Sequence, residues 1–172
     1  MIDIERIKEQ LKKSVDNEIY GHCIRTMEEA ERLALVYNTD IEKSKIAGLL
    51  HDCAKRKEKS DDNLKHADAG AQLAEKIYKI DDIDILNAIR YHTTGREAMT
   101  TLEKIIFMAD KIEINRNYQG VEELRTLAYD NINNAIIKSI MSTINYVKQK
   151  NLDIDIESIN TLNYLMKEGG NS

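Results

Sequence analysis

Residues 46–55 read IAGLLHDCAK, so a histidine and an aspartate directly follow an apolar run. Ile46, Leu49 and Leu50 recur at intervals of three and four residues, which is typical of one face of an amphipathic helix. A charged Asp52 within a buried helix is costly unless it is paired or bound to a cation. The stretch therefore predicts a buried helix that carries a group in need of positive charge.

Helical spacing of apolar residues continues on both sides of this stretch. The chain contains no proline and only seven glycines, so residues that break helices are scarce. Convincing strand-like alternation is missing from the sequence. We therefore predict an all-α fold, a single helical bundle, with Asp40 and Asp82 as N-caps and Gly120 in a turn. Later helices are expected at Ala67–Lys79, Ile83–His92, Thr101–Asn115, within Val121–Lys150, and at Ile156–Lys167.

Length and charge limit the classes of protein to which the chain can belong. A chain of 172 residues is the size of one domain. The net charge of −5, without a basic stripe, disfavours a nucleic-acid partner but leaves room for a small anionic substrate at a metal. There is no apolar run long enough for a membrane and no secretory signal, and the two cysteines form no C-x-x-C unit. These features predict a cytoplasmic protein.

The four histidines of the chain lie in or at the ends of expected helices. Besides His51, they are His22 in YGHCIRTMEEA, His66 in KHADAGAQLA and His92 in AIRYHTTG. Asp110 follows an apolar run in IIFMADKIE, so it too is expected to face the interior and need a positive partner. Imidazole and carboxylate together suit iron, manganese, cobalt or zinc.

A simpler interpretation exists for each of these residues alone. A single histidine on a helix is more often a surface or core residue than a metal ligand. Asp110 could be neutralised by Lys111 or Arg116 instead of an ion. The prediction of a metal site therefore depends on the combination and order of the residues.

The order His, His-Asp, His, His, Asp resembles the HD superfamily of metal-dependent phosphohydrolases. The strings YGHCIRTMEEAERLA, KIAGLLHDCAK, KHADAGAQLA, AIRYHTTGREAMTTLEKIIFMADKIEINR and GVEELR are together similar to the bacterial YqeK family. The resemblance covers residues from about 18 to 136, within a single HD domain expected to span 1–172. One departure is the connection at 56–65, which is shorter than in the family.

This resemblance implies a function and a set of ligands. The implied reaction is the hydrolysis of diadenosine tetraphosphate to two ADP by a metal-activated hydroxide. The implied cofactor is a pair of divalent ions, with iron expected and manganese, cobalt or zinc as alternatives. By position in the motifs, one ion would be held by His22, His51, Asp52 and Asp110. A second would be held by His66 and His92, with Asp52 bridging.

Several residues near these motifs are candidates for binding phosphate. Lys55 would share a helix face with His51 and Asp52, although it could equally be an exposed lysine in the run KRKEK. Arg96 follows a glycine that permits a sharp turn, and its guanidinium suits a phosphate. The predicted catalytic residues are Asp52, Lys55 and Arg96. The predicted substrate-binding residues are Arg25, Lys55, Thr93, Thr94, Arg96 and Arg116.

Some of these candidates have an equally simple structural interpretation. The arginines could form surface ion pairs, which we favour for Arg125. The threonines could cap a helix end. Tyr91 and Tyr118 could stack on a base or be partly buried in the core.

Two other functions fit the same sequence. One is a nucleotide phosphohydrolase of broader specificity, because a fold does not dictate its substrate. The other is a nucleotide-binding regulator with a vestigial site, against which the retention of all six ligand candidates argues. The sequence also allows a homodimer, without indicating the oligomeric state.

Overall fold

The computed structural model describes residues 3–55 and 65–169. Within these ranges all regular structure is helical, in nine helices, which confirms the all-α prediction. Most of the expected 56–65 connection lies outside the described residues. The helices are α1 (Ile4–Ser14), α2 (Asn17–Val36), α3 (Ile41–Leu50), α4 (Lys65–Lys76), α5 (Ile83–Arg90), α6 (Thr101–Ile112), α7 (Val121–Asp130), α8 (Ile132–Gln149) and α9 (Ile156–Gly169).

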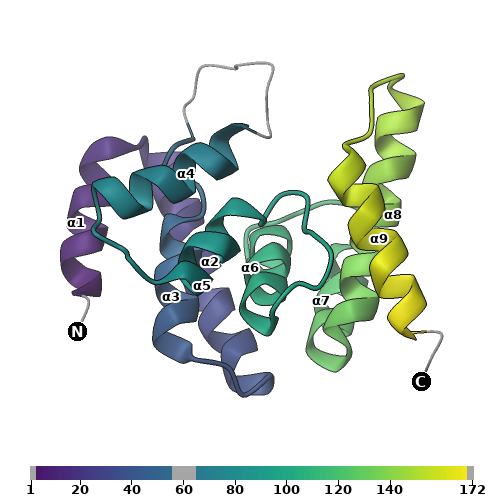
Figure 1. Ribbon diagram of the computed structural model, residues 1–172, viewed down its shortest axis with the longest axis horizontal. Helices are drawn as coiled ribbons and strands as arrows, with labels where there is room; N and C mark the ends of the chain where they lie inside the picture. Colours follow the sequence, from purple (N-terminus) through teal and green to yellow (C-terminus); the bar gives the residue numbers. More distant parts are fainter. Residues whose placement is uncertain (1–2, 56–64, 170–172) are drawn as a thin grey trace.

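Helix α6 lies at the centre of the arrangement (Figure 1), with α1–α5 on one side and α7–α9 on the other. It contacts α2, α3, α5, α7 and α8. Its four consecutive apolar residues, 105–108, are all buried, because neighbours surround this helix on several sides. A capping box of Thr100 and Glu103 fixes its first turn. The central helix thereby places Asp110 between the two groups of helices.

The predicted helix starts agree with the structure. The Asp40 side chain accepts a hydrogen bond from Lys43 N, and the Asp82 side chain accepts from Asp84 N and Ile85 N, so both act as N-caps. Gly120 precedes α7 with a φ of 90°, a conformation that favours glycine.

The predicted helix ends differ from the structure at three functionally important places. The expected single long helix within Val121–Lys150 is wrong, because extended Asn131 separates α7 from α8 and caps α8 through Asn134 N. Helix α5 ends at Arg90, so His92 lies in the following turn. Helix α6 ends at Ile112, so the segment after it is free to turn back over the helix end.

Helix α9 packs against the turn that follows His92. Gly95 has a φ of 70°, and a Cβ there would lie 2.7 Å from Thr161 Cγ2. The Thr161 hydroxyl also donates a hydrogen bond to Thr94 O at 3.2 Å. The C-terminal helix therefore supports the chain beside His92.

In the described part of the chain, we find no helix with the length and apolarity needed to cross a membrane.

Candidate metal centre

Five helices bring the six predicted ligands together. His22 lies on α2, His51 and Asp52 lie in the turn that ends α3, and Asp110 lies on α6. His66 lies in the first turn of α4, and His92 follows α5. Because α2, α3 and α6 all pack against one another, side chains far apart in sequence meet in one interior space.

The first group of side chains is centred on His22. Its Nε2 lies 3.1 Å from His51 Nε2, 3.0 Å from Asp110 Oδ1 and 3.7 Å from Asp52 Oδ2. His51 Nε2 lies 3.5 Å from Asp52 Oδ2 and 3.6 Å from Asp110 Oδ1. Ligand atoms bound ~2.1 Å from one ion lie roughly 3 Å apart when their bonds meet at right angles. The spacing of these atoms therefore fits one common ion.

The second group uses the other oxygen of Asp52. Asp52 Oδ1 lies 3.2 Å from His66 Nε2 and 3.5 Å from His92 Nε2, and the two nitrogens are 3.3 Å apart. Asp52 thus directs Oδ2 to the first group and Oδ1 to the second. A carboxylate in this position is suited to bridge two ions.

Backbone and carboxylate acceptors fix the histidine rings. His51 Nδ1 donates to Gly48 O and His92 Nδ1 donates to Ile89 O, each at 2.7 Å, because a carbonyl can only accept. His22 Nδ1 donates to Glu113 Oε1 at 3.2 Å. The Nε2 atoms are therefore left facing the carboxylates. Hydrogen bonds of this kind orient histidines that ligate metals.

The histidines and carboxylates of the site shift one another's pKa values. Burial lowers the pKa of His51, but the charges and hydrogen bonds of Asp52 and Asp110 outweigh burial and raise this pKa to about 10. Burial raises the pKa of both carboxyl groups, yet the histidines hold each pKa well below its usual value. The carboxylates that favour positive charge on His51 would favour a divalent ion in the same place.

One buried atom supports the same conclusion. Asp52 Oδ1 is buried and accepts no hydrogen bond of good geometry from the residues that the structure describes. Such an orphaned carboxylate oxygen is costly unless something else compensates it. Together with the converging imidazole nitrogens, this atom shows that the residues fit a pair of metal ions. Metal binding by these six residues stays a prediction.

The alternative partners of Asp110 are also present. Arg116 donates from Nη2 to Asp110 Oδ1 at 2.7 Å, and Lys111 Nζ lies 3.7 Å from Asp110 Oδ2. These two cations compensate the charge of Asp110, so its carboxylate can lie in the interior without a metal ion. They do not explain why four imidazole rings and both oxygens of Asp52 converge.

Glu113 is a functional candidate that the sequence interpretation missed. It is buried, and its Oε2 accepts from Arg25 Nε and Asn115 N, each at 2.8 Å, while its Oε1 accepts from His22. Burial raises the pKa of Glu113, but Arg25 and the other donors outweigh burial and lower it. A charged Glu113 therefore orients His22. The glutamate at the end of the ADKIE string was the available signal.

Arg125 has a structural role that differs from the predicted surface ion pair. It does pair with Glu122, but it also donates to the carbonyls of Ile112, Glu113 and Arg116, each at 2.9 Å. These bonds satisfy carbonyls at the end of α6 and hold the following segment in place. Arg125 thereby positions both Glu113 and Arg116 at the metal centre.

A pocket of about 450 Å³ opens onto the first group of ligands. Its wall includes His22 and Asp52 together with three predicted phosphate-binding residues, Arg25, Lys55 and Arg116. Lys55 Nζ lies 2.8 Å from Asp52 Oδ2, yet its side chain is 41% exposed. The structure therefore places the Lys55 ammonium between the metal ligands and solvent.

The remaining predicted residues lie on the His92 side. Thr93 Oγ1 lies 3.3 Å from His92 Nε2, whereas Thr94 donates to Gly95 O. Arg96 bonds to both oxygens of buried Glu103 and stacks 4.8 Å from the Tyr91 ring. Its guanidinium is thus engaged in holding the start of α6, and the phosphate contact expected of Arg96 stays a prediction.

Known proteins are similar to this chain in sequence and fold. Residues 19–115 match the family model described as the HD domain. A Halalkalibacterium halodurans protein named "Bis(5'-nucleosyl)-tetraphosphatase, symmetrical" is 41% identical over 167 residues, which cover 87% of this chain and 89% of that protein. A Bacillus subtilis protein of the same name is 36% identical over 174 residues, which cover 91% of this chain and 94% of that protein.

A solved structure agrees with these relatives. A crystal structure from Clostridium acetobutylicum, described as a predicted HD superfamily hydrolase involved in NAD metabolism, matches with a TM-score of 0.91 at 39% identity. The match covers 98% of this chain and 99% of that one. The chain therefore belongs to the HD-domain family, in the group that includes the relatives named symmetrical bis(5'-nucleosyl)-tetraphosphatase.

Proposed function

We propose that this protein is a metal-dependent hydrolase that cleaves diadenosine tetraphosphate symmetrically into two ADP. The names of its relatives support this substrate. The observation that carries the proposal is the sharing of Asp52 between two groups of imidazole nitrogens. A shared carboxylate is the expected arrangement for two ions that together act on one phosphoanhydride.

The two ions would be held by different residues. His22, His51, Asp52 and Asp110 would hold one, and Asp52, His66 and His92 would hold the other. When bound, such a pair lowers the pKa of a bound water toward neutrality and neutralises charge on phosphoryl oxygens. Iron is the ion expected, and manganese, cobalt and zinc fit the same ligand types.

The chain's own cations would bind the polyphosphate. Lys55, Arg25 and Arg116 line the pocket beside the first group, where they can neutralise phosphate oxygens. Lys55 is the most exposed of the three, with 41% of its side chain accessible, so it can leave Asp52 and follow the substrate. We assign Thr93, beside His92 Nε2, to contacting the substrate and Arg96 to positioning the turn through Glu103.

Product analysis tests the proposal. The protein is purified without oxygen, its metal content is measured, and it is incubated with diadenosine tetraphosphate. ADP as the sole product is expected. A mixture of AMP and ATP would exclude symmetrical cleavage, and comparable turnover of mononucleotides would favour the broader phosphohydrolase. No turnover by metal-replete protein would favour the nucleotide-binding regulator.

A further inference from the structure

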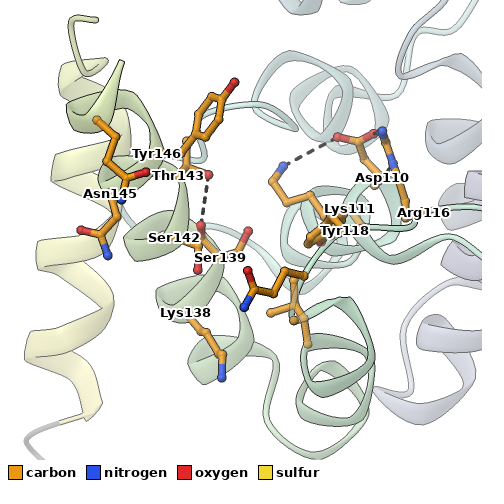
Figure 2. Close-up of a pocket in the computed structure, with 14 residues that line it drawn as sticks. Asp110, Lys111, Arg116, Tyr118, Lys138, Ser139, Ser142, Thr143, Asn145 and Tyr146 are labelled. Carbon is orange, nitrogen blue, oxygen red and sulfur yellow. Dashed lines mark hydrogen bonds and ion pairs between the residues drawn. The ribbon is translucent and has the colours of Figure 1, made fainter. Parts of the chain in front are cut away.

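A second pocket adjoins the metal centre on the side of α8 (Figure 2), with a volume of about 680 Å³. Its inner end is formed by the metal-ligand candidate Asp110 and by Lys111 and Arg116. Its outer wall includes Ser142 and Tyr146 of α8, and Figure 2 shows these across an open space from Lys111. A pocket of this size can hold a nucleoside.

Two exposed tyrosine rings line this pocket. Tyr118 is 45% exposed and Tyr146 is 60% exposed, which is high for aromatic side chains. The Tyr118 hydroxyl donates to Lys111 O at 2.8 Å, so its ring is held next to the lysine that faces the metal centre. Exposed aromatic rings are the side chains on which nucleobases stack.

The polar groups of the pocket suit a nucleotide whose phosphates point toward the metal centre and whose base lies near the tyrosines. Lys111 and Arg116 place positive charge at the inner end, where phosphates would reach the ions. At the outer wall, exposed Ser142 presents a hydroxyl that can bond to a ribose or base. The pocket therefore changes from cationic to aromatic and polar with distance from the metal centre.

We propose that this pocket, between the end of α6 and α8, binds one nucleoside half of the substrate, with its base against Tyr146 and Tyr118. The phosphates then pass Lys111 and Arg116 to the metal centre. The identity of the nucleotide rests on the proposed function. The binding mode rests on the pocket alone.

A neighbouring pocket of about 420 Å³ is the alternative location for the base. Apolar residues such as Leu152 line it, but Asp153 and Asp155 also line it, and their carboxylates oppose a polyphosphate. Its aromatic residue, Phe107, is buried and already has Lys111 Nζ 3.8 Å from its ring centroid. Lys111 lines both pockets, but the larger one also has Arg116 and two accessible tyrosine rings, so the larger pocket is favoured.

The position of the pocket in the chain has a consequence for specificity. The HD match ends at residue 115, whereas Tyr118 and all of α8 lie beyond it. The metal ligands and the aromatic, outer part of the nucleoside pocket are therefore contributed by different parts of the sequence. We assign the choice of nucleoside to the C-terminal helices.

Binding of ADP to the metal-loaded protein tests this pocket without requiring turnover. Isothermal calorimetry compares ADP with inorganic pyrophosphate, which has no base, for wild type and Tyr146→Ala. We expect the ratio of the two dissociation constants to shift against ADP by about ten-fold in the variant, because stacking on one ring is lost. Tyr146→Phe keeps the ring and should restore ADP binding.

Two further variants control this experiment. Met141→Ala changes an exposed residue of α8 that does not line the pocket, and it should leave both dissociation constants unchanged. Leu152→Ala probes the neighbouring pocket. The proposal is overturned if wild type does not bind ADP, if Tyr146→Ala binds it as well as wild type, or if Leu152→Ala alone weakens it. Product analysis of diadenosine tetraphosphate separately decides the proposed function.

Discussion

Asp52 presents its two carboxylate oxygens to different histidines, so both groups of ligands depend on one side chain. We expect Asp52→Asn to lose metal and to reduce turnover at least 100-fold, because an amide cannot bridge two ions. Helical content should stay the same, since the change removes a buried charge without changing volume. Elemental analysis, product assays and circular dichroism measure these effects.

Asp68→Asn is the matched control for this variant. Asp68 is an exposed carboxylate on α4 that pairs with Arg90. Its replacement should leave metal content and turnover unchanged. Full turnover in Asp52→Asn would contradict the bridging role.

Glu113 acts through His22 rather than on an ion. Glu113→Gln replaces one carboxylate oxygen with an NH2 group, which is a hydrogen-bond donor. This group would have to face another donor, either Arg25 or the His22 Nδ1–H group. We expect metal affinity to fall roughly 10- to 100-fold, the usual effect of losing a group that orients a ligand. Titration with Mn²⁺ measures the change. Glu5→Gln, at an exposed glutamate of α1, is the control, and equal affinities in the two variants would argue against this role.

At the scale of single residues, the sequence predicted the ligands better than their supports. Apolar runs precede His51, Asp52 and Asp110 in the sequence. Both their expected burial and the family motif therefore indicated these three residues as ligands. Glu113 and Arg125 are polar residues near a helix end, and only the path of the chain after α6 shows what they contact. The contacts of Arg96 were likewise decided by Glu103, which the sequence did not identify as buried.

At the scale of helices, an ion-pair cluster joins α3 to the start of α5. Lys43 Nζ lies 2.8 Å from Asp82 Oδ2 and 2.9 Å from Asp84 Oδ2. Burial raises the pKa of Asp82, but the Lys43 hydrogen bond and two backbone donors outweigh burial and lower it. Because the pKa of Asp82 is lower in the folded state, its charge stabilises the protein above its unfolded pKa of about 3.9.

Asp82→Asn tests this contribution, since asparagine is an equally good N-cap and only the charge is lost. We expect the variant to be less stable than wild type by up to ~1 kcal/mol at pH 7, a small value because the pair is partly exposed. The difference should disappear as the pH falls through the lowered pKa of Asp82. Urea unfolding at pH 7 and below pH 4 measures it, and a constant difference would contradict the linkage.

Helix class could be predicted from periodicity, while helix boundaries could not. Apolar spacing and the absence of proline indicated an all-helical chain. The break at Asn131 was missed because asparagine interrupts the pattern without disturbing the apolar spacing on either side. The end of α5 before His92 was missed because hydrogen bonds in the following turn, such as Gly95 N to Tyr91 O, replace the helical ones.

At the scale of the whole molecule, the ions would connect most of the helices. Ligand candidates come from α2, α4, α6 and the turns after α3 and α5, so they come together only in the folded state. Metal binding should therefore stabilise the folded state and not the unfolded chain. At a metal concentration 100 times the dissociation constant, the gain is ~2.7 kcal/mol, which corresponds to roughly 5–10 °C in Tm.

Differential scanning calorimetry with Mn²⁺ and then with a chelator measures this shift, which the chelator should reverse. Asp52→Asn should show no shift with Mn²⁺. An equal shift in that variant would mean that the ion binds elsewhere.

The long separation between His22 and Asp110, 88 positions apart in the chain yet 3.0 Å apart in the fold, also bears on biosynthesis. A nascent chain cannot complete the first ligand group until Asp110 has left the ribosome. A zinc finger, by contrast, collects all its ligands within one short segment. In this protein an ion would be bound only after α6 has been synthesised, so loading would depend on the metal available to the folded chain rather than on metal present early in synthesis.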